Sequence, residues 1–130
     1  MIGLDTNVLI RYLTQDDPEQ ASRAGRVIEG CTKDAPGLVS LVVLCELVWV
    51  LRGAYGYEKR LVVEVLELIL AIGVLQVEAE PVARSSLAAY RRGPADFADY
   101  VIIFSNAASG CAWTYSFDLH LARHDYVQIP

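Results

Sequence analysis

Acidic side chains stand at positions along this chain from which several carboxylates could act together. Asp5 follows a short apolar run, Asp96 and Asp99 open a helical pattern, and Asp118 stands just after the segment 112–116, with one residue between them. Aspartate is also a preferred helix N-cap, and an acid in the first helical turn gains from the helix dipole. Each position taken alone therefore fits a structural cap as well as a chemical group.

Glu46 differs from these aspartates because it lies in the middle of a very apolar helical pattern, "LVVLCELVWVL". A buried carboxylate without a partner costs several kcal/mol, so such a group needs a cation, a metal ion or a proton. With apolar residues at Val42, Val43, Trp49 and Val50, the pattern shows no evident solvent face. We therefore expect Glu46 to be buried and functional. The alternative is that it belongs to a solvent-exposed stripe.

Carboxylates that converge without His or Cys partners suit a hard divalent ion, Mg²⁺ or Mn²⁺, better than zinc. Such a site can hold a phosphodiester and activate a water molecule, so hydrolysis of phosphodiester bonds is the leading chemistry. His120 and His124 stand four residues apart, but no third zinc ligand or HExxH glutamate accompanies them. The sequence contains no phosphate-binding glycine loop and no GxSxG motif.

Alternating strand and helix patterns must position these acids. Strands are predicted over 2–4, 38–40, 74–78, 111–116 and 126–129, and helices over 8–13, 17–30, 41–53, 57–73, 80–92, 95–110 and 117–125, with Asp17 and Ser40 as N-caps. This order predicts one α/β domain over residues 1–130, with a mainly parallel central sheet of about five strands flanked by helices. In such sheets ligands bind beyond the carboxyl ends of the strands, where Asp5 and Asp118 are expected.

The composition restricts the class of protein. The net charge of −5 argues against a protein that coats nucleic acid, so RNA would need a local basic patch. The candidates for that patch are Arg11, Arg52, Arg91, Arg92 and Arg123, although each arginine alone also fits a solvated helix end. Three cysteines without CxxC spacing, Cys31, Cys45 and Cys111, are expected to be reduced.

No long apolar segment interrupts this pattern. The longest apolar stretch, residues 41–51, contains Glu46 and is too short to span a bilayer, and no leader pattern precedes the first strand. We therefore expect a cytoplasmic protein without a membrane anchor. The apolar stripe of the helix at 58–72, preceded by Tyr55 and Tyr57, predicts a homodimer.

Four motifs resemble the PIN-domain ribonucleases, and among them the VapC-type toxins of toxin–antitoxin pairs. These motifs are "GLDTNVLIRYLTQDDPEQ", "GLVSLVVLCELVWVLRGAYGY", "GPADFADYVI" and "TYSFDLHLAR", and the resemblance that rests on them covers nearly the whole chain. The resemblance implies a Mg²⁺- or Mn²⁺-dependent endoribonuclease that is held inactive by a VapB-like antitoxin. It places the catalytic metal ligands at Asp5, Glu46, Asp99 and Asp118.

Supporting roles follow for the neighbours of these acids. We expect Asp96 to hold a water of the metal shell or to cap its helix, and Thr114 and Ser116 to orient Asp118. Thr6 and Asn7 are expected to orient Asp5 through hydrogen bonds with the backbone, and one of the two supplies the helix cap so that Asp5 serves as a ligand. These supporting residues are Thr6, Asn7, Asp96, Thr114 and Ser116.

The chain departs from the family pattern at two places, "IFSN" (103–106) and Leu119–His120 after Asp118, which concern packing and specificity rather than the ligands. One alternative is a non-catalytic interaction module with the same fold, against which the presence of all four acids counts. A phosphoacceptor receiver domain is a further alternative. It needs a lysine late in the chain, whereas the only lysines here are Lys33 and Lys59.

Overall fold

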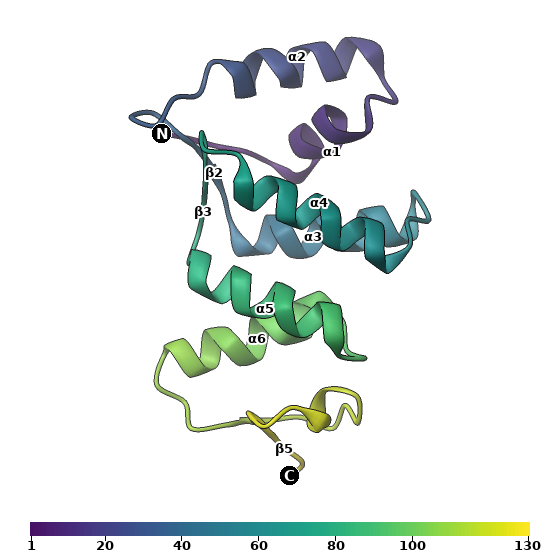
Figure 1. The fold of residues 1–130 in the computed structure, drawn as a ribbon, viewed down its shortest axis with the longest axis vertical. Coiled ribbons are helices and arrows are strands. Elements are labelled where there is room, and N and C mark those ends of the chain that lie inside the picture. The colour runs from purple at the N-terminus through teal and green to yellow at the C-terminus, as the bar shows by residue number, and fades with distance from the viewer. The chain divides into compact units, whose positions relative to one another are not determined.

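Short parallel strands alternate with helices along the chain (Figure 1). The computed structural model describes residues 1–130, which form two compact units, Met1–Glu78 and Ala79–Pro130. The N-terminal unit contains, in order, β1 (Ile2–Gly3), α1 (Thr6–Thr14), α2 (Pro18–Glu29), β2 (Gly37–Val39), α3 (Leu41–Gly53), α4 (Lys59–Ala71) and β3 (Leu75–Val77). The C-terminal unit contains α5 (Glu80–Arg92), α6 (Phe97–Ala108), β4 (Thr114–Tyr115), the 3₁₀ turn η1 (Leu121–Arg123) and β5 (Val127–Gln128). None of the six α-helices combines the length and hydropathy that crossing a bilayer requires.

The strands confirm the predicted α/β class and parallel pairing, but they form two sheets. In the N-terminal unit the order is β1-β2-β3, with Ile2 opposite Gly37 and Leu38 opposite Gln76. In the C-terminal unit β4 pairs with β5. The prediction of one central sheet of about five strands was therefore right in strand number and wrong in grouping. Each strand has only two or three residues, and such short ladders leave the choice of neighbour to contacts distant in the sequence.

Two predicted helix caps are confirmed. The Asp17 side chain accepts a hydrogen bond of 3.0 Å from the Gln20 backbone N–H, and Pro18 occupies the first helical position of α2. The Ser40 hydroxyl accepts a bond of 3.2 Å from Val43 N–H at the start of α3. Both helices thus begin where the sequence pattern predicts. The last predicted helix, 117–125, is in fact reduced to the short turn η1.

The core of the N-terminal unit lies around α3 and α4. Its fully buried members include Leu47 and Leu51 of α3, and Val62, Leu66 and Ile69 of α4. The last three belong to the stripe on which the homodimer prediction was based. Most of that stripe is therefore covered within the unit, by the packing of α4 on α3 and β3. Only its margin, represented by Leu61 and by the adjacent Leu68, is exposed.

The C-terminal unit is built on the pair α5 and α6. Phe97 and Tyr90 meet edge to face with ring centroids 5.9 Å apart, and both are buried. Gly93 ends α5 and is required there, since a Cβ atom at this position would collide with the Tyr100 hydroxyl. The same hydroxyl accepts a hydrogen bond of 3.3 Å from Ala95 N–H, which fixes the turn between the two helices.

Candidate functional site

Asp5 stands at the N-cap position of α1, with extended backbone angles, but its carboxylate accepts no capping hydrogen bond. The expectation that Thr6 or Asn7 supplies this cap was wrong. Thr6 is already the first helical residue and its hydroxyl bonds elsewhere, and the side chain of Asn7 makes no hydrogen bond in the structure. The Asp5 carboxylate is exposed, so it is open to an external ligand.

Glu46 receives the Thr6 hydroxyl. Thr6 Oγ1 donates to Glu46 Oε1 over 3.1 Å and joins the start of α1 to the middle of α3, across forty positions of the chain. Thr6 is 5% exposed, so its own position is well defined by packing. Thr6 therefore positions Glu46. The prediction that its side chain orients Asp5 through a hydrogen bond with the backbone was wrong.

The predicted burial of Glu46 was wrong. Glu46 is exposed and shares one face of α3 with Val42 and Trp49, which are 67% and 56% exposed. Residues at spacings of three and four lie on the same helix face, so this face points outward although two of its members are apolar. Burial thus gives no reason to assign a cation to Glu46. The observation that still associates Glu46 with Asp5 is its hydrogen bond to Thr6, the residue that follows Asp5.

Asp99 lies in the first turn of α6, and its carboxylate accepts a hydrogen bond of 3.1 Å from Asp96 N–H, as in a capping box. Partial burial raises the pKa of Asp99 above its usual value, and the negative charges of Asp118 and Asp96 raise it further, against the opposing effect of that hydrogen bond. The three acids of this unit therefore repel one another. A bound cation would relieve that repulsion.

Asp118 is held by the segment around it. Its backbone N–H donates to Ser116 Oγ over 3.0 Å, and its Oδ1 accepts from the backbone N–H groups of His120 (2.8 Å) and Leu121 (3.1 Å) at the start of η1. Oδ2 carries no hydrogen bond in the structure. The carboxylate is therefore oriented by one oxygen while the other stays available.

The side chain of Thr114 makes no hydrogen bond to Asp118, contrary to the prediction. Its Oγ1 accepts a hydrogen bond of 2.9 Å from Asn106 Nδ2 and so ties β4 to the end of α6. Asn106 belongs to "IFSN", one of the two places where the sequence departs from the family pattern. That departure therefore serves the packing of the C-terminal unit.

The predicted ligands belong to different units: Asp5 and Glu46 to the N-terminal unit, and Asp99 and Asp118, with the supporting residue Asp96, to the C-terminal one. The structure contains no group of three or more His, Cys, Asp or Glu side chains that could hold a metal ion. Each unit thus holds two of the four carboxylates that the sequence predicts as ligands.

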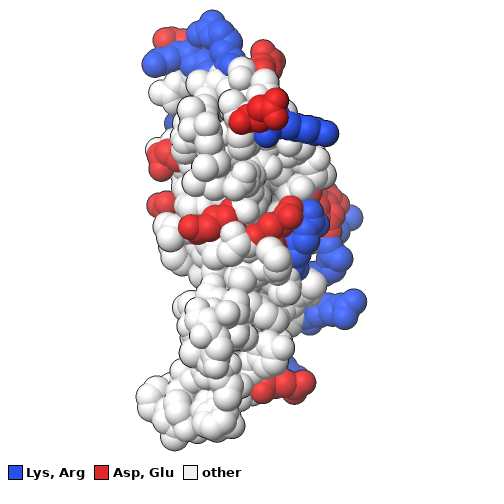
Figure 2. Space-filling view, turned by 90° about the vertical axis from the view of Figure 1, so that its left-hand side faces the viewer, with Lys and Arg blue, Asp and Glu red and all other residues white.

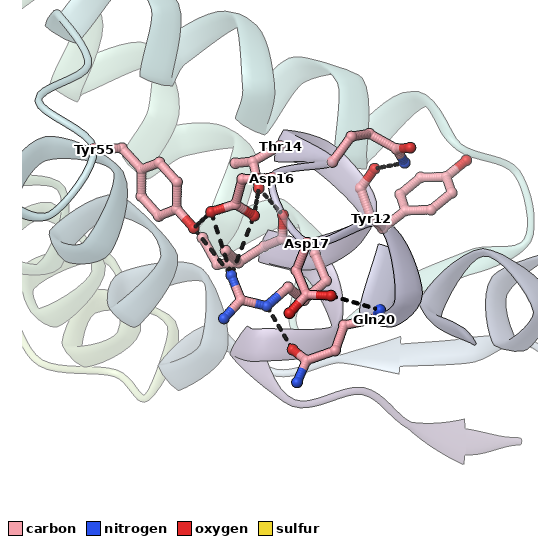
Figure 3. Close-up of polar contacts among 9 residues, drawn as sticks. Tyr12, Thr14, Asp16, Asp17, Gln20 and Tyr55 are labelled. Atoms are coloured by element: carbon pink, nitrogen blue, oxygen red, sulfur yellow. Dashed lines mark hydrogen bonds and ion pairs between the residues drawn. The ribbon is translucent and has the colours of Figure 1, made fainter. Parts of the chain in front are cut away.

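Arg11, one of the predicted RNA-binding residues, is engaged within the N-terminal unit (Figure 3). Its guanidinium donates to Gln20 Oε1 at 2.6 Å, to Asp16 Oδ1 at 3.2 Å and to the Tyr55 hydroxyl at 3.2 Å. Tyr55 in turn donates to Asp16 Oδ2 at 2.7 Å, and Thr14 donates to Asp16 Oδ1 at 2.8 Å. Asp16 is the centre of this cluster, and no local pattern in the sequence identifies it because Tyr55 is 39 residues away.

Arg52 also has an internal partner, since its Nη1 donates to the Tyr57 carbonyl oxygen at 3.1 Å. Arg92 and Arg123 differ, because neither makes a side-chain hydrogen bond or ion pair in the structure. Both line a cavity of about 640 Å³ in the C-terminal unit. The other residues that line this cavity include Tyr100, Phe104, His120 and His124. His120 and His124 are four residues apart in the sequence, and Tyr100 and Phe104 have the same spacing on α6. The sequence does not indicate that the two pairs line one cavity, which the fold shows.

The PIN domain family model matches residues 2–126, and the chain belongs to this family. PIN domains are generally nucleases and typically use divalent metal ions. No curated protein matches the chain significantly. The family match covers both units and includes all four acids that the sequence predicts as ligands.

Proposed function

We propose that this protein is a Mg²⁺- or Mn²⁺-dependent endoribonuclease that acts as the toxin of a toxin–antitoxin pair in the cytoplasm. The observation that carries this proposal is the PIN family match over residues 2–126, and the matched region contains the four acids to which the sequence resemblance assigns the metal. The four acids are Asp5, Glu46, Asp99 and Asp118.

Their chemistry fits a hard divalent ion. All four donors are carboxylate oxygens, which Mg²⁺ and Mn²⁺ prefer, and no His or Cys competes among them. Two further observations support the fit: the Asp5 carboxylate is uncommitted, and the pKa of Asp99 is raised by burial and by its acidic neighbours. When bound, such an ion supplies an activated water and neutralises charge that develops on the phosphate oxygens.

The protein's own residues contribute orientation. Thr6 fixes one oxygen of Glu46, Asp96 N–H fixes one oxygen of Asp99, and the start of η1 fixes one oxygen of Asp118. Each of these bonds leaves the second carboxylate oxygen free to act as a ligand. Outer contacts of this kind set the angle of a ligand and strengthen metal binding.

The decisive experiment uses Asp5→Asn, which keeps the size and capping ability of the side chain and removes one negative charge. We expect purified Asp5→Asn protein to lose RNA cleavage by orders of magnitude, and its expression to no longer arrest growth, while its melting temperature stays near that of the wild type. Asp34→Asn, at an exposed acid of the same unit that forms no ion pair, is the control and should keep full activity. Equal cleavage by wild type and Asp5→Asn, or wild-type cleavage that resists a chelator, would exclude the proposal.

Exposed apolar side chains support the proposed protein partners, an antitoxin and a second copy of the chain. The C-terminal unit exposes Trp113, Tyr115, Phe117 and Leu119 by 44–80%. Figure 2 shows that the drawn face of this unit, in the lower part of the view, carries few charged side chains. Apolar surfaces of this kind commonly form protein interfaces. The same observation favours the second candidate, a non-catalytic interaction module, which predicts a stable complex with a partner and no metal-dependent cleavage.

A further inference from the structure

We propose that the cavity of the C-terminal unit binds one nucleotide of a single-stranded RNA, next to the phosphodiester bond that the acids would cleave. For brevity we call it the α5–α6 cavity, after the helices that supply Ala88, Arg92, Tyr100 and Phe104 to its lining. This inference rests on the proposed ribonuclease function and names a binding site for its substrate.

The size of the α5–α6 cavity suits a nucleotide. Its volume of about 640 Å³ lies within the range of roughly 300–1,000 Å³ that is typical of small-molecule sites. It is also open to solvent on one side, so a bound nucleotide can remain part of a longer strand.

Positive charge is concentrated at this cavity. The C-terminal unit has four arginines and no lysine, and two of the four, Arg92 and Arg123, line the cavity. Both are exposed and neither has an ion-pair partner in the structure, so their guanidinium groups are available to phosphate oxygens. In a protein with a net charge of −5, this pair offers a local attraction for the RNA backbone.

Aromatic rings provide the second element of nucleotide recognition. The His124 ring lies edge to face with Phe104, at a centroid distance of 5.3 Å, and with Tyr100, at 6.3 Å. Tyr100 is buried, whereas Phe104 and His124 are partly exposed, so these two rings are the ones open to a base. Aromatic side chains that line a basic groove stack with bases, whatever the base. His124 Nδ1 accepts a hydrogen bond of 3.1 Å from Tyr126 N–H, so in the neutral ring the proton sits on Nε2, where it is a hydrogen-bond donor.

The chain also connects this cavity to the acids. Tyr100 directly follows Asp99, and His120 comes two residues after Asp118, to whose carboxylate its backbone N–H is bonded at 2.8 Å. The segments that carry these acids therefore also line the α5–α6 cavity. Asp99 and Asp118 do not themselves line the cavity, so the phosphate on which they are proposed to act would lie outside it, next to the bound nucleotide.

The test is the binding of a fluorescein-labelled, single-stranded RNA of about 8 nucleotides to the full-length protein in excess EDTA. Fluorescence anisotropy then reports binding without cleavage, so its outcome is independent of whether the protein proves to be a nuclease. We expect Arg92→Gln/Arg123→Gln to weaken binding about tenfold or more and to flatten the salt dependence, by roughly 0.7 in log–log slope for each lost phosphate contact. Arg26→Gln, at an exposed arginine of α2, is the matched control and should bind like the wild type.

A second variant tests the cavity without changing charge. Ala88 is an exposed residue of α5 that lines the cavity, so Ala88→Trp fills the cavity while leaving the core intact. We expect this variant to melt like the wild type and to lose RNA binding about tenfold, because it occupies the space of the base. Unchanged RNA affinity in either Arg92→Gln/Arg123→Gln or Ala88→Trp overturns the inference. If the wild-type protein binds the RNA but does not cleave it with Mg²⁺ or Mn²⁺, this result contradicts only the proposed nuclease activity.

Discussion

Thr6→Val is the substitution that best separates two effects of the Thr6 hydroxyl: its effect on the position of Glu46 and its effect on the stability of the fold. Valine keeps the shape of threonine and removes the hydroxyl that donates to Glu46 over 3.1 Å. A hydrogen bond to a charged group contributes about 1.5–3 kcal/mol where the partner cannot be rehydrated. Glu46 is exposed, however, so water replaces the lost donor, and the added methyl group is buried at a site that is 5% exposed. The net cost in unfolding free energy should therefore stay below about 1 kcal/mol.

The effect on function should be larger. If Glu46 is a metal ligand, loss of its orienting partner should reduce metal affinity or RNA cleavage by about 10–100-fold. The assay is the Mn²⁺ concentration for half-maximal RNA cleavage, measured beside a thermal melt. Thr6→Ser, which keeps the hydroxyl, should restore most of the activity even though it removes a buried methyl group. Wild-type activity in Thr6→Val, or equal impairment of the serine and valine variants, would refute this role for Thr6.

Three further predictions follow from the charges and thiols. Millimolar Mg²⁺ or Mn²⁺ should raise the melting temperature, because an ion at 100 times its dissociation constant adds about 2.7 kcal/mol to the free energy of unfolding. Asp99→Asn should reduce this shift, and a melting temperature that does not change with ion concentration in calorimetry would contradict the site. Hydrogen bonds from Tyr55 and Thr14, followed by the charge of Arg11, lower the pKa of Asp16 below its usual 3.8, so its stabilising effect is complete above that pH and is lost as the pH falls through the lowered pKa. Asp16→Asn should therefore melt below the wild type at pH 7, and the gap should close in strong acid. Burial raises the pKa of Cys45 to about 11, so iodoacetamide at pH 7.5 should label the exposed Cys111 well before Cys45; mass spectrometry that finds equal labelling would argue against this packing.

Helix starts could be predicted from the sequence because the signals that set them are local. Asp17 with Pro18, and Ser40 before an apolar run, each satisfy backbone N–H groups within three residues. The position of Asp99 in the first turn of α6 followed from the same kind of signal. Helix starts that are stabilised by hydrogen bonds within one turn can therefore be predicted from the sequence alone.

What could not be predicted depends on contacts between distant segments. The hydropathy around Glu46 is high on every side, so the sequence did not indicate which face of α3 points outward. Its partner Thr6 lies forty positions away, as remote as Tyr55 is from Asp16. The grouping of five short strands into two sheets is of the same kind, since pairing between parallel strands is always distant in sequence.

Asp5 and Asp17 offer an internal comparison that bears on the role of Asp5. Both occupy N-cap positions with extended backbone, yet only Asp17 accepts a capping hydrogen bond. Loss of a working N-cap costs about 1 kcal/mol, so Asp17→Ala should lower stability by about that amount, whereas Asp5→Ala should lose only the weaker attraction of its charge to the helix dipole. Urea unfolding of the two variants measures the difference directly. A larger destabilisation by Asp5→Ala would mean that Asp5 serves its helix. A larger destabilisation by Asp17→Ala, together with the loss of RNA cleavage expected for Asp5→Asn, would mean that the Asp5 carboxylate does not cap α1 and stays free to bind a ligand.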